Sequence, residues 1–179
     1  MMVKSILIID LVNDFVTGKF GSERAVKVVS STVKILEKVS VKVPVIFTLD
    51  THIKNDPEFA VWGEHCLIGT RDSQLHPDLE KFPGYRITKR HYDAFFETDL
   101  EGYLKALNIT ELYVFGVSTD ICVLHTVSGA FHRYLKTSVV EDLCAAINEE
   151  RHKEAIDFMS RNYGARVISS AAMLEELGF

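Results

Sequence analysis

Cys122 is the residue of this chain whose sequence context best suits a nucleophile. It ends the segment at residues 116–122 (GVSTDIC), which follows an apolar, strand-like run at residues 112–115 and leads into a helix-like segment. Backbone N–H groups at a helix N-terminus have no intrahelical partner and the helix dipole is positive there, so a thiolate would be stabilised and its pKa lowered. The alternative is a small buried residue in a strand-to-helix turn, because free cysteines are commonly buried.

Asp10 and Lys89 are the residues that could assist such a nucleophile. A thiol needs a base or a positive field to ionise, and a group must later protonate the leaving group. Asp10 ends an apolar, strand-like run at residues 6–9, where poor solvation raises the pKa of a carboxyl group unless a cation such as Lys89 lies near. Beside Cys122 the pair could relay a proton. Otherwise, it would be an ion pair that closes the edge of a sheet.

The elements that must position these residues follow from the hydrophobic pattern, in which short β-branched runs alternate with longer segments of helical period. The runs predicted as strands are residues 5–9, 43–49, 85–88, 112–115, 137–140 and 165–168. The segments predicted as amphipathic helices are residues 23–41, 98–107, 121–134, 149–163 and 171–177. This alternation predicts an α/β protein of three layers (α/β/α), with helices on both faces of a six-stranded parallel sheet.

Polar or small residues stand just past the carboxyl ends of four predicted strands, at Asp10, Asp50, Lys89 and Gly116. In parallel sheets ligands bind beyond the carboxyl ends of the strands, so we expect these residues to meet at one rim. The stretch at residues 51–84 has no clear period and holds three of the four prolines. A connection of this length is typically functional.

Composition limits the classes of function. The 179 residues, 47% apolar, predict one domain over residues 1–179. The cysteines (Cys66, Cys122 and Cys144) are odd in number and lack a C-x-x-C pair, which argues against a disulfide framework and favours a cytoplasmic location. The N-terminal apolar run is too short for a signal peptide or membrane span. A net charge of −5 without a basic cluster argues against nucleic-acid or membrane partners and favours a small-molecule substrate.

Five motifs carry a resemblance to a known family. They are IIDLVNDF at residues 8–15, DTH at 50–52, WGEHC with GT at 62–70, KRHYDAF at 89–95 and GVSTDICV at 116–123. Through them the chain resembles, over essentially its whole length, the isochorismatase-like cysteine hydrolases, which include nicotinamidases, N-carbamoylsarcosine amidases and isochorismatases. The resemblance implies the Rossmann-like fold of that family.

The resemblance also implies a catalytic triad of Asp10, Lys89 and Cys122. The Cys122 thiolate would attack a carboxamide, Asp10 would deliver a proton to the departing ammonia, and water would hydrolyse the thioester. The backbone N–H groups of Ser118 and Cys122 would form the oxyanion hole, next to a cis peptide bond between Val117 and Ser118. Isochorismatases have no cysteine at this position, so Cys122 favours amide hydrolysis.

Asp50, His52 and His65 offer an oxygen and two nitrogens of the kind that bind a divalent ion. Nicotinamidases use this arrangement, and the resemblance implies a fourth ligand that corresponds by spacing to Glu58, with Asp56 as a substitute. Zinc is the expected ion, and manganese or iron would also suit an acidic ligand. In the alternative there is no metal, because N-carbamoylsarcosine amidases share the triad and do without one.

Phe15, Trp62 and Phe96 are expected to form the apolar walls that hold a flat ring. Cys144 is expected in a polar loop. The leading hypothesis is a metal-assisted amidase that converts nicotinamide to nicotinic acid. The alternatives are a metal-free amidase of the N-carbamoylsarcosine type and a non-catalytic ligand-binding or oligomerising domain of the same fold. The resemblance implies a homo-oligomer, a dimer or tetramer, to which the helix at residues 121–134 could contribute Phe131 and Tyr134.

Overall fold

The structure is a computed structural model that describes residues 3–39 and 41–179. Its sheet has six parallel strands in the order β3-β2-β1-β4-β5-β6. The strands are β1 (Val3–Ile9), β2 (Val45–Asp50), β3 (Tyr85–Lys89), β4 (Ile109–Val117), β5 (Lys136–Ala145) and β6 (Arg166–Ile168). The predicted six-stranded parallel sheet is confirmed.

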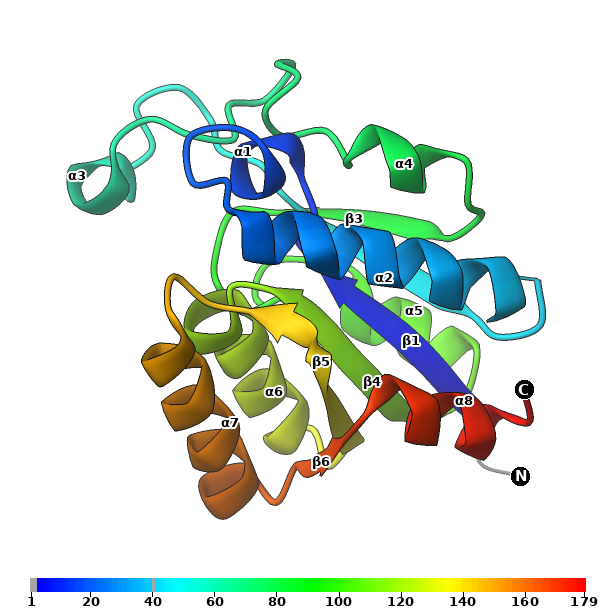
Figure 1. Ribbon diagram of the computed structural model, residues 1–179. Helices are drawn as coiled ribbons and strands as arrows, with labels where there is room; N and C mark the ends of the chain where they lie inside the picture. Colours follow the sequence, from blue (N-terminus) through cyan, green and yellow to red (C-terminus); the bar gives the residue numbers. More distant parts are fainter. Residues whose placement is uncertain (1–2, 40) are drawn as a thin grey trace.

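Helices cover both faces of this sheet, with α2 and α8 on one face and α5, α6 and α7 on the other (Figure 1). The helices are α1 (Asn13–Val16), α2 (Glu23–Val39), α3 (Phe59–Trp62), α4 (Pro77–Glu80), α5 (Leu100–Ala106), α6 (Leu124–Phe131), α7 (Glu149–Tyr163) and α8 (Ser170–Leu177). A π-helical turn, Thr119–Val123, precedes α6. The predicted three-layer α/β/α architecture is therefore confirmed.

The central strand β1 explains why the core forms where it does. Its residues Ile6, Leu7, Ile8 and Ile9 are all fully buried, because β2 and β4 flank the strand and helices cover both of its faces. A strand buried on both faces is a continuous apolar run rather than an alternating one. The helix α2 instead buries only one stripe of residues at spacings of three and four, as its predicted amphipathic pattern requires.

Most predicted elements differ from the structure by one to three residues at their ends, and two elements differ further. Strand β5 continues past Val140 to Ala145, so Cys144 is a buried strand residue paired with Gly116, and its predicted place in a polar loop is wrong. The exposed residues Glu141 and Asp142 interrupt the apolar pattern of this strand, which makes its second half resemble a loop. The helix predicted at residues 121–134 begins as the π-helical turn and ends earlier, because Tyr134 has a positive φ of 57°.

The carboxyl ends of the strands meet at one edge, as the sequence predicts. Asp50 pairs with Lys89 across β2 and β3, and Ile9 pairs with Gly116 across β1 and β4. At Gly116 the chains approach so closely that a Cβ atom would lie 2.1 Å from the Ile9 carbonyl oxygen, and its φ of 133° also favours glycine. Among the residues that the structure describes, no helix combines the length and apolarity needed to cross a membrane.

Candidate active site

The structure brings Asp10, Lys89 and Cys122 together at this edge, all three buried. The Lys89 Nζ atom lies 2.6 Å from the Asp10 Oδ2 atom and 3.6 Å from the Cys122 Sγ atom. The same ammonium lies 3.2 Å from the Asp50 Oδ1 atom, so two carboxylates share one buried cation. This arrangement places a thiol, a carboxylate and a fixed positive charge within one cluster.

Burial and neighbouring charges set the protonation of the cluster. Burial raises the pKa of Asp10, an effect that the Lys89 ammonium and the Thr48 hydroxyl, which donates to Asp10 at 2.7 Å, oppose. Burial lowers the pKa of Lys89, but the Asp10 and Asp50 carboxylates outweigh it and hold that pKa well above its usual range. Lys89 is therefore a permanent cation.

The pKa of Cys122 differs from the sequence prediction. Burial raises the pKa of this thiol well above its usual range, against the opposing Lys89 ammonium, while Asp10 and Asp50 raise it further. The predicted lowering is therefore wrong for the free protein, since desolvation and two carboxylates outweigh the single cation. A thiol whose pKa is raised needs a base to ionise near neutral pH. Asp10, which shares the Lys89 ammonium with Cys122, is a carboxylate of the same cluster.

The turn that carries Cys122 contains the expected cis peptide bond between Val117 and Ser118. Ser118 and Cys122 both line one cavity. The Ser118 hydroxyl donates to Asp120 at 2.5 Å, and Asp120 pairs with Arg151 of α7 at 3.4 Å, which anchors the turn to that helix.

A cluster of possible metal ligands lies next to the cysteine, in contact with Lys89 through Asp50. Potential ligand atoms of Asp50, His52 and His65, all buried, lie within 4.8 Å of one another. The Asp50 Oδ2 atom is 3.0 Å from His52 Nε2 and 3.6 Å from His65 Nε2. One carboxylate oxygen and two imidazole nitrogens therefore point at a common centre.

The structure separates the two acidic residues that spacing left open. The Glu58 Oε1 atom lies 3.9 Å from His52 Nε2 and 3.8 Å from His65 Nε2, on the side of the common centre. Asp56 instead faces the far nitrogen of His52, with 3.2 Å between its Oδ2 atom and Nδ1. Glu58 can therefore be a fourth ligand, whereas Asp56 can only orient the imidazole.

The donor set fits a divalent ion of the zinc type, for which carboxylate oxygen and imidazole nitrogen are ordinary ligands. The His65 Nδ1 atom donates to the Gly63 carbonyl at 2.8 Å, which leaves its Nε2 atom with a lone pair for a metal. Burial lowers the pKa of His52, but Asp50 and Asp56 outweigh it and raise that pKa to about 9. An ion that binds there must displace a proton from His52, so its affinity would increase with pH.

A cavity of about 440 Å³ opens onto Cys122 and this cluster. Its lining residues are Phe15, Lys19, Phe20, Gly21, Ser22, Ala25, Asp50, Glu58, Trp62, His65, Tyr92, Val117, Ser118, Ile121, Cys122, Ala145, Ala146 and Ile147. Two of the predicted wall residues, Phe15 and Trp62, are among them. Phe96 is not, because it lies 52% exposed with its ring edge-on against His91, 4.7 Å between centroids. This placement differs from the sequence prediction for Phe96.

Sequence reasoning missed two aromatic residues of the wall, Phe20 and Tyr92. The Phe20 ring lies 5.4 Å from His65 and 6.2 Å from Trp62, both edge-on. The Tyr92 hydroxyl accepts a hydrogen bond of 2.8 Å from the Trp62 indole nitrogen. Tyr92 lies in the KRHYDAF motif at residues 89–95, three residues after Lys89, and this proximity is a signal that could have identified it. Nothing local to Phe20 shows that its loop folds over the cavity.

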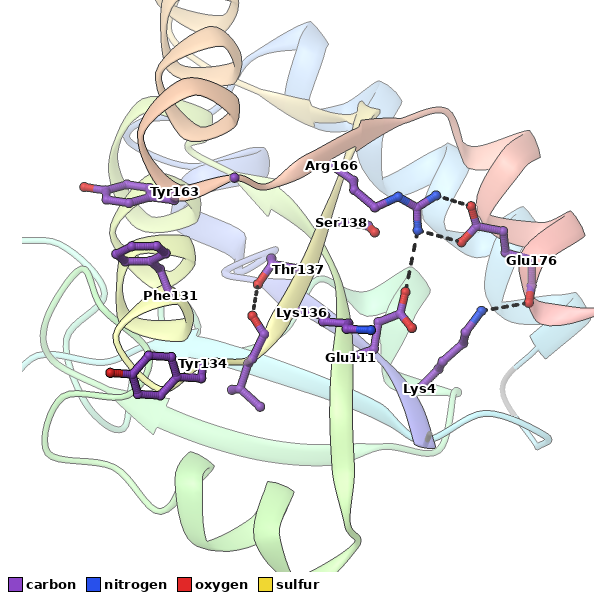
Figure 2. A pocket seen from close by; sticks show the side chains of 12 residues that line it. Lys4, Glu111, Phe131, Tyr134, Lys136, Thr137, Ser138, Tyr163, Arg166 and Glu176 are labelled. Atoms are coloured by element: carbon purple, nitrogen blue, oxygen red, sulfur yellow. Dashed lines mark hydrogen bonds and ion pairs between the residues drawn. The ribbon is translucent and has the colours of Figure 1, made fainter. Parts of the chain in front are cut away.

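A second and larger cavity, about 760 Å³, lies at the opposite end of the sheet (Figure 2). Aromatic rings of Phe131 and Tyr163 face it from one side, and an ion pair between Arg166 and Glu176 faces it from the other. Its lining contains no cysteine or histidine, and none of the predicted site residues. The smaller cavity is therefore the candidate active site.

An α/β protein with a buried cysteine beside a lysine that also pairs with a carboxylate, at the carboxyl edge of a parallel sheet, has the construction of a cysteine hydrolase. The family model described as the isochorismatase domain matches residues 4–172. The chain therefore belongs to the isochorismatase family, and it is an amidohydrolase of that family.

Three known proteins illustrate this similarity. The nicotinamidase of Escherichia coli is 28% identical, over 98% of this chain and 99% of its own length. A structure of N-carbamoylsarcosine amidase from Thermoplasma acidophilum has a TM-score of 0.86 and 32% identity, covering 94% of this chain and 97% of the other. A structure of the nicotinamidase/pyrazinamidase from Bacillus subtilis has a TM-score of 0.86 and 29% identity, covering 94% and 100%.

Proposed function

We propose that the protein is a metal-assisted amidase that releases ammonia from a small aromatic carboxamide, with nicotinamide as the expected substrate. The observation that carries this proposal is a continuous series of side-chain contacts that joins the nucleophile to the ion site. Cys122 contacts Lys89, and Lys89 contacts Asp50. Asp50 in turn contacts His52 and His65. The nicotinamidases among its relatives support the choice of substrate.

The reaction begins when Asp10 takes the proton of the Cys122 thiol and the thiolate attacks the amide carbon. The resulting oxyanion is stabilised by the backbone N–H groups of Ser118 and Cys122. Asp10 then gives its proton to the amide nitrogen, the C–N bond breaks, and ammonia leaves a thioester. Water attacks the thioester while Asp10 accepts its proton. The C–S bond then breaks, Asp10 returns the proton to the Cys122 thiolate, and the carboxylic acid departs.

Lys89 keeps its charge throughout these steps. Its ammonium stabilises the thiolate as it forms and keeps Asp10 ionised until the proton arrives. The raised pKa of Asp10 suits a group that must both take and give a proton near neutral pH. The protonated resting thiol needs this base, since it does not ionise unaided.

Asp50, His52, His65 and Glu58 would hold the ion, and Asp56 would orient His52. When bound, the ion would supply a fixed positive charge and open positions for water or a ring nitrogen. Phe15, Phe20 and Trp62 would enclose the ring of the substrate.

The test is ammonia release from nicotinamide by the purified protein, by Cys122→Ala and by protein stripped with a chelator. Activity that is lost in Cys122→Ala and in the stripped protein, and that zinc restores to the stripped protein, would support the proposal. No release from nicotinamide would contradict it.

A second candidate is a metal-free amidase of the N-carbamoylsarcosine type, favoured by the similarity to the Thermoplasma acidophilum structure. Ammonia release from N-carbamoylsarcosine that survives chelation would establish this alternative.

We also propose that residues 1–179 form one domain and that the protein is a homo-oligomer. Sedimentation would test the oligomeric state.

A further inference from the structure

Asp14 is a buried carboxylate that the proposed chemistry does not use. Its Oδ1 atom accepts a hydrogen bond of 3.0 Å from the backbone N–H of Lys19, and its Oδ2 atom accepts one of 2.8 Å from the backbone N–H of Cys66. The fit around it is close, because a Cβ atom on Gly18 would lie 2.6 Å from the Oδ1 atom. One side chain therefore joins two loops that are far apart in the sequence.

Both of these loops form walls of the candidate active site. Lys19 and the residues at 20–22 line the cavity, and so do Trp62 and His65, which the Phe20 ring contacts. Cys66, which Asp14 holds, directly follows His65 and has a positive φ of 44°. A non-glycine residue keeps this conformation only where its surroundings define it, and the Asp14 carboxylate is such a partner.

A second set of contacts connects the same two loops nearer to solvent. The Lys19 Nζ atom donates to the Trp62 carbonyl at 2.8 Å and to the Glu64 carbonyl at 3.0 Å. The two loops are therefore connected by a buried carboxylate and by an exposed ammonium. The Trp62 indole, on the second of these loops, donates to the Tyr92 hydroxyl.

We propose that Asp14 is a positioning residue of the active site, which sets the ion-binding geometry of His65 and the place of the Trp62 wall by joining residues 19–22 to residues 62–66. Lys19 reinforces the same joint through its ammonium. The part that concerns His65 rests on the proposed function, because it assumes that His65 binds an ion. The part that concerns Trp62 does not.

The neighbouring residue Asn13 provides a matched control. It also lies buried in α1, and its amide donates to the carbonyls of Arg71 and Gln74 at 2.8 and 3.1 Å. Neither of those residues lines the cavity. Asp14→Ala and Asn13→Ala therefore each remove two hydrogen bonds between a buried side chain of the same helix and backbone groups. Only the first pair of bonds reaches the loops that line the cavity.

Trp62 is the single tryptophan of the chain, so its fluorescence reports on this wall without any substrate or ion. We expect acrylamide to quench Trp62 more strongly in Asp14→Ala than in Asn13→Ala, when both are compared at equal fractions folded. We also expect Asp14→Ala to bind zinc more weakly than wild type, by about tenfold or more. This is the range found when groups that orient metal ligands are removed. Asn13→Ala should bind zinc as wild type does.

The exposed variant Lys19→Met tests the same joint if Asp14→Ala does not fold, and it should also increase quenching of Trp62. Quenching and zinc affinity that change equally in Asp14→Ala and Asn13→Ala would overturn the proposal, since Asp14 would then serve the fold alone. Unchanged quenching in Lys19→Met and Asp14→Ala would overturn it as well. A wild-type protein that binds no zinc would contradict the proposed function, while the quenching comparison would still decide the role of Asp14.

Discussion

Replacement of Lys89 by methionine should destabilise the fold more than any exposed charge substitution. The change keeps most of the length of the side chain but leaves the Asp10 and Asp50 carboxylates, at 2.6 and 3.2 Å from the former ammonium, without their shared cation. Removal of one partner from a buried ion pair typically costs about 3–5 kcal/mol. At roughly 2–4 °C per kcal/mol for a chain of this size, the melting temperature should fall by roughly 6–20 °C.

The loss should depend on pH with a definite sign. Without the Lys89 cation the pKa of Asp10 rises further and that of Asp50, which Lys89 helps to lower, rises too. A carboxyl group whose pKa is higher in the folded state than in the unfolded state, about 3.9 for aspartate, contributes stability at low pH that is lost as pH rises through the folded pKa. Lys89→Met should therefore be most destabilised, relative to wild type, at alkaline pH.

Thermal unfolding of metal-free protein, followed by circular dichroism at pH 5.5 and pH 8, measures both effects. Lys105→Met is the control, because Lys105 pairs with Glu101 on the exposed surface of α5, where a screened ion pair contributes little. A melting temperature for Lys89→Met within about 2 °C of wild type would refute the assignment of Lys89 as the shared buried cation. A deficit that grows as pH falls would refute the electrostatic reasoning.

Three further outcomes follow from the site. Cys122→Ala should lower ammonia release by about 10⁴-fold or more, measured at steady state, because removal of a nucleophile disables the whole catalytic unit. Zinc at 100 times its dissociation constant should stabilise the metal-free protein by about 2.7 kcal/mol, and His65→Ala should abolish this shift in a thermal scan. Because burial raises the pKa of Cys122, its alkylation by iodoacetamide should still accelerate above about pH 8.5, the pKa of a free thiol. A rate that levels off near pH 7 would contradict this.

The part of the site that lies at strand ends could be predicted because it depends on topology alone. Once the alternation of elements indicates a parallel sheet, residues that follow its strands must meet at one edge, as Asp50 and Lys89 do across β2 and β3. Cys144 shows where this reasoning stops. Exposed acidic residues inside β5 interrupt its apolar pattern, and only the pairing with Gly116 shows that the strand continues.

The roles of Glu58 and Asp56 could not be separated by sequence because both are acidic residues within a few positions of His52. What distinguishes them is the side of the imidazole ring that each one faces, and this depends on how the loop before α3 folds. Spacing along a chain limits which residues can meet, but it does not determine which nitrogen of a histidine they reach.

The pKa of Cys122 depends even more on three-dimensional context. The argument from a helix N-terminus counts one local effect that favours the thiolate, whereas in the folded protein burial and two carboxylates act against it and Lys89 acts for it. A thiol that is protonated at rest is protected from adventitious oxidation and alkylation, since the thiolate is the reactive form. In the reaction that we propose, a protonated resting thiol also makes formation of the nucleophile depend on Asp10, so the same carboxyl group is already protonated when ammonia leaves.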